Sequence, residues 1–388
     1  MHADEFIQPW LAQLRGRIPG LELFDAHTHI GQNDPDGFKC SAGELTAMLE
    51  TAGGRAAVFA MHEPDGYRAA NDATVAAAAD SEGRLVAFCR LDPRADPLAE
   101  AERSLGAGAA GIKLHPRAEG FALDTPELAG VFALAAERRV PVLVHAGRGI
   151  PALGRHAVAI CERHPDLRLI LAHAGICDLA WIWRVVDQHP NLFFDTSWWS
   201  PSDLLALYAL VAPRHILFAS DAPYATPSFA AAMNMRYAMQ AGLEGDGLRS
   251  VFGAQMARII SGEQALDAGP APGPSRLDSD PLLDRVHTFL VASIGQMFQG
   301  VDPAETLALA ALACEVGEGA PQADTCATVL ELLELRRQQV DRGAHDERVP
   351  RFAPGVWTIV AAAGVTRTPG VPVPPAGEPA TSVGERGP

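Results

Sequence analysis

The sequence predicts a (β/α)₈ barrel that is followed by a helical appendage. Eight short apolar runs alternate with Ala- and Leu-rich stretches of helical spacing, and their starts lie roughly 23–35 residues apart. This alternation indicates a parallel sheet, and strands too apolar to have a solvent face favour a closed barrel. An open doubly wound sheet more often carries a Gly-rich phosphate loop after its first strand, and residues 31–34 do not match one.

The expected elements of the barrel follow from the apolar pattern in chain order. Strands are expected near 21–29, 56–62, 85–91, 110–115, 140–146, 168–174, 191–197 and 216–222. Helical spacing lies between them near 41–52, 67–79, 98–105, 126–138 and 152–164. A further helix, near 251–260, is expected to close the barrel.

The composition then changes and divides the chain into four expected parts. Residues 1–266 are assigned to the barrel, and residues 267–280 to a linker rich in Pro and Gly. Residues 281–365 are assigned to the helical appendage, and residues 366–388 to a disordered tail dominated by Pro and Gly. Within the appendage, apolar residues recur at helical spacing over 282–298, 303–316 and 325–340.

Composition and charge restrict the partners and the compartment. Hydrophobic residues make up 48% of the chain and charged residues 20%, which is ordinary for a soluble enzyme. A net charge of −16 disfavours nucleic acid and anionic membranes, and no apolar stretch approaches the roughly 18–20 residues of a membrane span. The acidic start lacks a secretory pattern, and six scattered cysteines are typical of free thiols. We expect a cytoplasmic protein, a small-molecule substrate and the capacity to form a homo-oligomer.

Residues that can bind a metal stand at the ends of several expected strands. His27 and His29 end the first strand, where side chains two residues apart project to one face. His145, His173 and Asp221 end the fifth, sixth and eighth strands. These ends converge at the mouth of a barrel, where this architecture places active sites. Imidazoles with a carboxylate suit Zn²⁺, Mn²⁺, Fe²⁺ or Ni²⁺ rather than Ca²⁺ or Mg²⁺, so we expect a divalent metal, with Zn²⁺ as the first choice.

The fourth strand ends in Lys113, one of two lysines in the chain. Because Arg supplies nearly all other positive charge, this lysine suggests a role that Arg cannot fill. A buried ammonium among histidines is costly unless it is neutralised, linked to a metal or chemically modified. We therefore count Lys113 among the expected catalytic residues.

Other residues near the expected mouth are candidates for substrate binding. Arg148 could hold a carboxylate through two hydrogen bonds, or it could be a solvated loop residue. We assign Arg148 and His115 to substrate binding. Trp198 and Trp199 follow the seventh strand, and they either wall the pocket or pack between barrel and helices. Arg90, at the end of the third strand, is a further candidate to face the pocket.

Five segments carry a family resemblance, and all lie between about residues 21 and 262. They are Asp25–Gly31, Gly111–Pro116, Val144–Gly147, Leu171–Gly175 and Ala219–Pro223. In this order they resemble the motifs of the amidohydrolase superfamily, and most closely its amidohydrolase 2 branch of metal-dependent TIM-barrel hydrolases and decarboxylases. The resemblance does not extend to the C-terminal helices.

The resemblance implies roles for the strand-end residues. It implies His27, His29 and Asp221 as ligands of a buried metal. It implies His145 and His173 as further ligands, or His173 as a polarising or acid–base group. Lys113 matches the position at which binuclear members carry a carbamylated lysine, whereas other members use one metal, so one or two metals per chain are expected.

The leading expectation is a metal-dependent hydrolase that attacks the carbonyl-type carbon of an amide, lactone or ester with metal-activated water. Asp221 would accept the proton of that water, and the metal or His173 would polarise the carbonyl oxygen. The alternative is non-oxidative decarboxylation of an unsaturated or aromatic carboxylic acid. It needs a cationic grip on the carboxylate and a wall for a flat ring, for which Arg148 and the tryptophans at 198 and 199 are candidates. A non-catalytic barrel is disfavoured because the expected ligands are all present.

Overall fold

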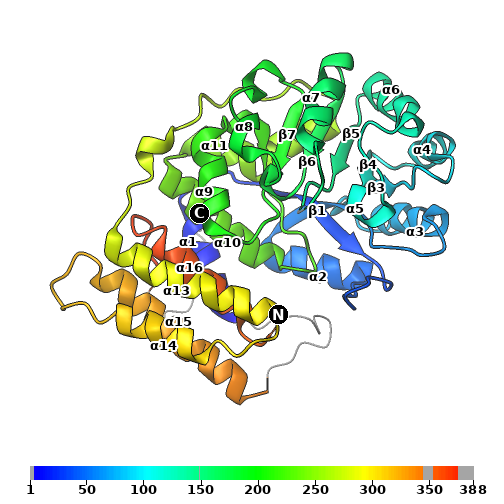
Figure 1. Cartoon of the computed structure of the whole chain (residues 1–388). Helices are drawn as coiled ribbons and strands as arrows, with labels where there is room; N and C mark the ends of the chain where they lie inside the picture. The colour runs from blue at the N-terminus through cyan, green and yellow to red at the C-terminus, as the bar shows by residue number, and fades with distance from the viewer. Residues whose placement is uncertain (1–3, 148, 344–352, 375–388) are drawn as a thin grey trace, which may run out of the picture.

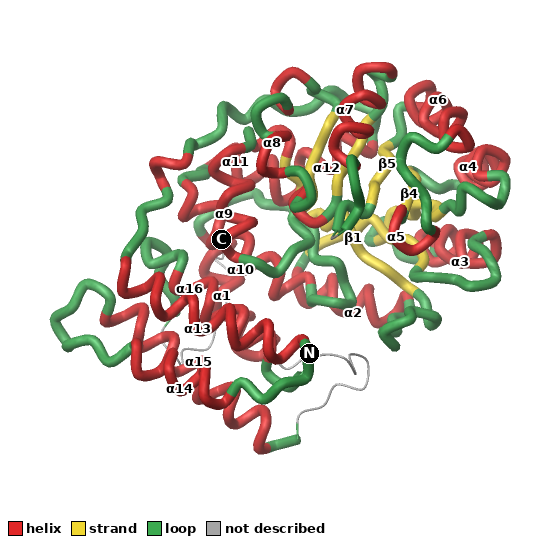
Figure 2. The backbone as a smooth tube through the Cα atoms, in the orientation of Figure 1, coloured by secondary structure: helices red, strands yellow, loops and turns green. Residues whose placement is uncertain are grey.

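Eight parallel strands alternate with helices around a barrel, which confirms the predicted (β/α)₈ fold (Figures 1 and 2). The computed structural model describes residues 4–147, 149–343 and 353–374. The strands are β1 (Leu23–Ile30), β2 (Gly54–Ala60), β3 (Leu85–Arg90), β4 (Gly111–Leu114), β5 (Pro141–Val144), β6 (Arg168–Leu171), β7 (Leu192–Asp195) and β8 (Ile216–Leu217). They follow one another around the sheet in chain order.

The ring is closed by hydrogen bonds between β1 and the segment that contains and follows β8. Ala26 N donates to Phe218 O (2.9 Å), and His29 N donates to Ala222 O (2.7 Å). Alternate strand residues form a buried apolar cluster, for example Ala57 with Phe59. This period of two is expected of strands that direct every second side chain into a barrel.

Helices on the outside cover the other face of each strand. They are α2 (Ala42–Ala52), α3 (Arg68–Ala79), α4 (Pro97–Gly106), α5 (Pro116–Glu119), α6 (Ala129–Arg138), α7 (Leu153–Arg163), α8 (Leu179–Ile182), α9 (Pro201–Leu210), α10 (Pro227–Ala241), α11 (Gly245–Arg249) and α12 (Gln255–Ile260). Several start at residues that satisfy the free N–H groups of the first turn. Ser41 forms a capping box with Glu44, and Thr226 caps α10 by accepting from Phe229 N.

A helix that the apolar pattern did not predict precedes the barrel. It is α1 (Asp4–Gly16), which buries Ile7, Trp10 and Leu11 and packs against α10. Gln8 Nε2 donates to Ser228 Oγ at 2.8 Å across this contact. The N-terminal segment thus covers α10 on the outside of the barrel.

Four helices follow the Pro- and Gly-rich segment, and the fourth was not predicted. They are α13 (Pro281–Phe298), α14 (Ala304–Ala313), α15 (Ala323–Asp341) and α16 (Val356–Thr366). Helix α16 is buried along nearly its whole length and contacts α10, α13 and α15. Gly364 allows the close approach to α10, because a Cβ there would collide with Met233 and Tyr237. Among the described residues, every helix falls short of the length and apolarity of a membrane span.

The first part of the expected disordered tail is packed against the barrel, which corrects that expectation for residues 366–374. The guanidinium of Arg236, in α10, is buried and donates to the carbonyl oxygens of Thr368 (3.2 Å), Val371 (2.7 Å) and Pro372 (3.1 Å). A buried cation that finds three carbonyl acceptors holds this segment in place. The remainder of the expected tail, 375–388, lies outside the described residues.

Candidate metal centre and its cavity

Three side chains from opposite ends of the barrel sequence meet at its mouth. His27 Nε2 lies 3.1 Å from His29 Nε2, and Asp221 Oδ1 lies 3.2 Å from the former and 3.0 Å from the latter. In the part of the chain that the structure describes, this is the one group of three or more metal-binding side chains whose donor atoms lie together. The two histidines are almost fully buried, whereas Asp221 reaches solvent.

The backbone is held in an uncommon conformation at two of the predicted site residues. Asp221 and His173 have φ angles of 60° and 58°, in the left-handed region that side chains other than Gly seldom adopt. Asp221 N donates to His27 O at 3.0 Å, which ties the turn after β8 to the strand that carries the histidines. Strain of this kind persists where the surrounding structure enforces it, and it clusters at functional sites.

Asp195, at the end of β7, orients His27 from below. Its Oδ2 lies 2.8 Å from His27 Nδ1, and its Oδ1 accepts from His173 N at 3.0 Å. Burial alone would raise the pKa of Asp195, but the neighbouring His27 lowers it below its usual value. The carboxylate therefore fixes the proton of His27 on Nδ1 and leaves the Nε2 lone pair facing His29 and Asp221.

The donor atoms fit a divalent cation. Their separations of 3.0–3.2 Å suit three ligands of one ion at about 2.0–2.2 Å, the usual distance for Zn²⁺ with nitrogen and oxygen. Burial lowers the pKa of His27 to about 3, and the nearby Lys113 lowers it further, so the imidazole is neutral at physiological pH. Burial raises the pKa of Asp221 in the absence of a cation, which a bound metal would reverse.

Lys113 lies directly beneath this group. It is fully buried, its Nζ lies 3.2 Å from His27 Nε2, and it stands 4.5 Å from the ring centre of Phe59. Burial lowers the pKa of Lys113 to about 7, an effect opposed by Asp195 and Asp221. The amine thus contacts a proposed ligand, as the sequence motif led us to expect.

The other predicted residues form a second row beside the three donors. His173 Nδ1 donates to Ser197 O at 2.7 Å, and His173 Nε2 lies 2.9 Å from His145 Nδ1. His115 stacks on His145 with ring centres 3.8 Å apart. His145 and His173 therefore stand at the same mouth. The His173 ring packs on His27, with ring centres 5.3 Å apart, but its nitrogens face His145 and Ser197 and not the three donor atoms. Arg148 lies outside the described residues.

A cavity of about 1290 Å³ opens above the site. All the metal-binding candidates line it, together with aromatic side chains from several elements. The sequence left open whether Trp198 and Trp199 wall the pocket or pack between barrel and helices. Both line the cavity. Arg90 lines it as well, with its Nη2 donating to the buried Glu119 Oε1 at 2.7 Å.

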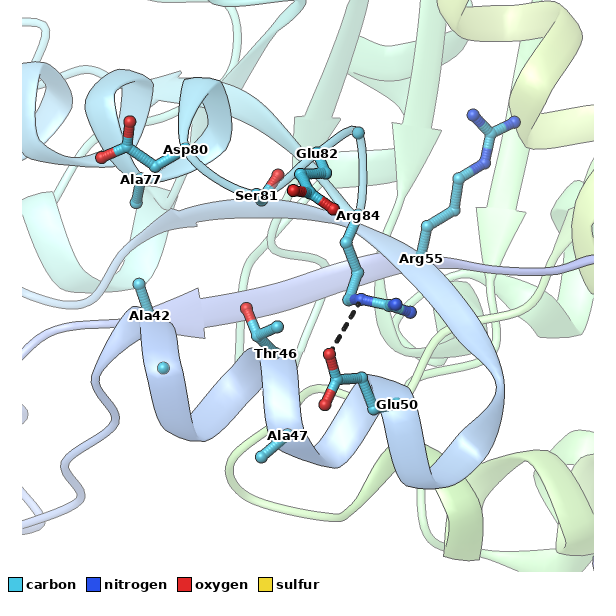
Figure 3. Close-up of a pocket in the computed structure, with 12 residues that line it drawn as sticks. Ala42, Thr46, Ala47, Glu50, Arg55, Ala77, Asp80, Ser81, Glu82 and Arg84 are labelled. Atoms are coloured by element: carbon cyan, nitrogen blue, oxygen red, sulfur yellow. Dashed lines mark ion pairs between the residues drawn. The ribbon is translucent and has the colours of Figure 1, made fainter.

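A second depression, of about 800 Å³, lies on the outer surface between α2 and the turn after α3 (Figure 3). Arg84 and Glu50 form an ion pair of 3.7 Å beside it, and Arg55 stands at its edge. Arg55 and Arg84 lie at the amino ends of β2 and β3, the face of a barrel that serves stability rather than catalysis. We assign no function to it.

Two functional candidates were missed from the sequence. Asp195 ends β7, so the same rule of polar residues at strand ends could have found it. Glu119 lies in α5, and its Oε1 accepts from Arg90 and from Tyr67 (2.5 Å). No strand-end pattern marks Glu119, because only the fold of the loop after β4 brings it to Arg90.

The number of metals can be tested through Lys113. Since the donors form one group of three, we expect one metal per chain in the wild type and also in Lys113→Ala, with turnover reduced in the variant. Metal analysis by mass spectrometry checks this, with the exposed second lysine, Lys39→Ala, as the matched control. Two metals in the wild type, falling to one in Lys113→Ala, would instead indicate the carbamylated, bridging form.

Comparison with known proteins agrees with this architecture. A family model described as "Amidohydrolase", of the amidohydrolase 2 group, matches residues 24–237, more than half of the chain. None of the curated proteins matches the chain. The model ends before α13, so the appendage lies outside the matched segment.

Solved structures share the barrel at low identity. A 2,6-dihydroxybenzoate decarboxylase from Rhizobium is 16% identical, with a TM-score of 0.50, over 62% of this chain and 99% of its own. A 5-carboxyvanillate decarboxylase from Novosphingobium aromaticivorans, with bound manganese, is 16% identical, with a TM-score of 0.50, over 62% and 97%. An uncharacterised TIM-barrel protein from Bordetella bronchiseptica is 14% identical, with a TM-score of 0.51, over 62% and 99%. With the family model spanning five ordered motifs and the barrel holding a His-His-Asp site for a divalent metal, this chain belongs to the amidohydrolase family, in its amidohydrolase 2 branch.

Proposed function

We propose that this enzyme is a metal-dependent, non-oxidative decarboxylase of an aromatic or otherwise unsaturated carboxylic acid. The observation that carries the proposal is the aromatic wall of the cavity above the three donors. Tyr224 stands edge-on to His29 with ring centres 5.5 Å apart, and Phe38 packs on Tyr224 at 4.5 Å. Trp198 lies 6.2 Å from His173. These rings all line the cavity and can pack against a flat substrate.

Positive charge for the carboxylate comes from two arginines of the cavity. Arg90 is buried at the end of β3, and its Nε has no hydrogen-bond partner among the described residues. Arg117, in α5, lines the cavity at a solvent-exposed position. His115, which stacks on His145, lies on the same side of the cavity and can donate to a carboxylate oxygen. The assignment of Arg148 to substrate binding stays a prediction, because this residue lies outside the described residues.

The names of the similar solved structures support this reaction class. Two of the three solved structures described above are decarboxylases of ring-bearing acids by their names, and one of these holds manganese. Their likeness supports decarboxylation over the hydrolysis that the sequence put first. It also supports Mn²⁺ beside Zn²⁺ as a metal to test.

The chemistry follows from the placement of the side chains. A divalent metal held by His27, His29 and Asp221 supplies the positive charge that orients the substrate's carboxylate and a neighbouring oxygen. The aromatic wall holds the ring so that the bond to the carboxylate can break and release carbon dioxide. The carbon left behind accepts a proton, which Asp221 would take up from a hydroxyl of the substrate or from water and pass on, because its carboxyl lines the cavity beside the two histidines. His173, fixed by the Ser197 carbonyl, faces the same space through Nε2.

The experiment measures the release of the carboxyl carbon as carbon dioxide and the addition of a proton to the carbon left behind. Metal-loaded protein is incubated in D₂O with a panel of hydroxylated aromatic acids labelled with ¹³C in the carboxyl group, and with lactones and amides. We expect labelled carbon dioxide and one deuterium at the vacated carbon, detected by NMR and mass spectrometry. Turnover of lactones or amides alone, with no release of carbon dioxide, would replace this proposal with hydrolysis. Protein from which the metal has been removed by a chelator is the control.

A further inference from the structure

The C-terminal helices contribute side chains to the cavity above the metal centre. Gly295, Phe298 and Gln299 of α13 line it, as do Trp357 and Val360 of α16. The appendage is therefore a part of the site and not a separate module. Figures 1 and 2 show these helices beside α1 and α10, on one flank of the barrel.

Aromatic contacts fix the appendage residues against the barrel. Phe298 meets Trp199 edge-on, with ring centres 5.6 Å apart. Trp357 meets Phe229 of α10 in the same way, at 5.2 Å. Each pair joins one appendage helix to one barrel segment, so the wall is built from both parts of the chain. Such edge-to-face pairs define the position of the rings more closely than apolar contact alone.

The cavity is larger than a single-ring acid requires. Its volume of about 1290 Å³ exceeds the range of about 300–1,000 Å³ that is typical of small-molecule sites. The donors and arginines occupy one part of the lining. Another part is formed by α9, α10, α13 and α16, and most of its side chains are apolar.

One polar group in this second part lacks a partner. Tyr237, in α10, is 1% exposed and lines the cavity, and its hydroxyl has no hydrogen-bond partner among the described residues. Burying an unpaired hydroxyl is unfavourable, and protein structures usually supply a partner. The hydroxyl is closed off from solvent and lies against Gly364 of α16, so Tyr237 offers its ring and not its hydroxyl to the cavity.

We propose that α13 and α16 complete a distal chamber, formed by Phe229, Tyr237, Gly295, Phe298 and Trp357. It binds the far end of an elongated acid, an apolar, ring-bearing substituent that packs against these side chains. The placement of the acid group at the metal rests on the proposed function, whereas the chamber itself rests on the cavity lining. The appendage thereby selects substrates by length.

Gly295 offers a direct test because it faces the chamber with free space. A Cβ added at this position meets no heavy atom within 4 Å. Gly295→Phe should fill the chamber without disturbing the barrel, and Gly295→Ala is the matched control for the change in helix propensity. Binding to metal-loaded, full-length protein is measured by calorimetry for benzoate, biphenyl-4-carboxylate and 4′-acetylbiphenyl-4-carboxylate.

We expect the wild type to bind the two biphenyl acids at least about 10-fold more tightly than benzoate, since the second ring buries apolar surface. Gly295→Phe should abolish this preference and leave benzoate affinity within about twofold, whereas Gly295→Ala should retain it. Equal effects of Gly295→Phe on all three acids, or none, would overturn the proposal.

A second pair of variants keeps the test valid if Gly295→Phe fails to fold. Phe298→Ala removes one wall of the chamber, and Phe289→Ala changes the same residue type on the same helix outside the lining. Only Phe298→Ala should reduce the preference for biphenyl acids. Because these are binding measurements, they separate the two proposals. Length selection without decarboxylation would reject the reaction alone, and decarboxylation without length selection would reject the chamber alone.

Discussion

Replacing Asp221 with asparagine is expected to lower kcat/KM by about 10³-fold or more, equivalent to about 4 kcal/mol of transition-state stabilisation. The substitution removes the anionic donor that stands 3.0 Å from His29 Nε2 and 3.2 Å from His27 Nε2. It also removes the acid that we assign to protonation of the product carbon. Metal content should fall together with activity, because two neutral imidazoles remain where three donors met.

Steady-state kinetics and metal analysis of the same preparations check this result. Asp187→Asn is the control, since that carboxylate is 65% exposed on the surface and its ion pair with Arg214 is worth little to stability. Circular dichroism should show an unchanged fold, because Asp221 lies above the barrel core. A fully metal-loaded Asp221→Asn variant with turnover near that of the wild type would remove Asp221 from the site.

Asp195→Asn is expected to reduce metal affinity by about 10- to 100-fold, the usual effect of removing a group that orients a metal ligand. Asp195 is completely buried and its two oxygens contact His27 Nδ1 (2.8 Å) and the backbone N–H of His173 and Ser197 (both 3.0 Å). Asparagine has the same shape as aspartate, but its NH₂ group would face one of these N–H groups. Two hydrogen-bond donors would then point at each other. His27 then loses the partner that directs its lone pair to the metal.

Competition with a chelator of known affinity measures the dissociation constant of the metal. Asp25→Asn is the matched control, because Asp25 is equally buried but contacts no imidazole nitrogen. It accepts from the backbone N–H groups of His27 (3.1 Å) and Ser220 (3.0 Å) and from the Ser220 side chain. Burial raises the pKa of Asp25 to about 7, so its charge is partly lost already at neutral pH. We expect its effect on metal affinity to stay below about threefold. Equal losses in both variants would show a general effect of buried carboxylates rather than orientation of His27.

The barrel could be predicted because its signals are local. Each strand needs only a short apolar run such as Val142–Val144 or Leu169–Leu171, and each helix needs only its own period. Chain order then decides the neighbours, since parallel strands joined by helices pair in sequence. Helix α16 was missed for the opposite reason. Helix α16 is apolar on all sides and shows no period that would mark a surface helix.

The site likewise has residues that the sequence could identify and contacts that it could not. His27, His29 and Asp221 could be identified because a strand end fixes where its side chain lies, whatever the rest of the chain does. The link between His145 and His173, and the support of His27 by Asp195 from 168 residues away, depend on side-chain directions that no sequence spacing encodes.

The sequence by itself determined the barrel, the mouth at which its chemistry lies and the residue types that can hold a divalent metal there. These follow from periodicity and from the rule that parallel strands end together. The tertiary structure alone decided that α13 and α16 line the cavity, that Arg236 holds residues 368–372 and that aromatic rings flank the donors. Those features arise from packing between segments far apart in the chain. Shape and burial decide which of these contacts form, and the local sequence pattern does not predict them.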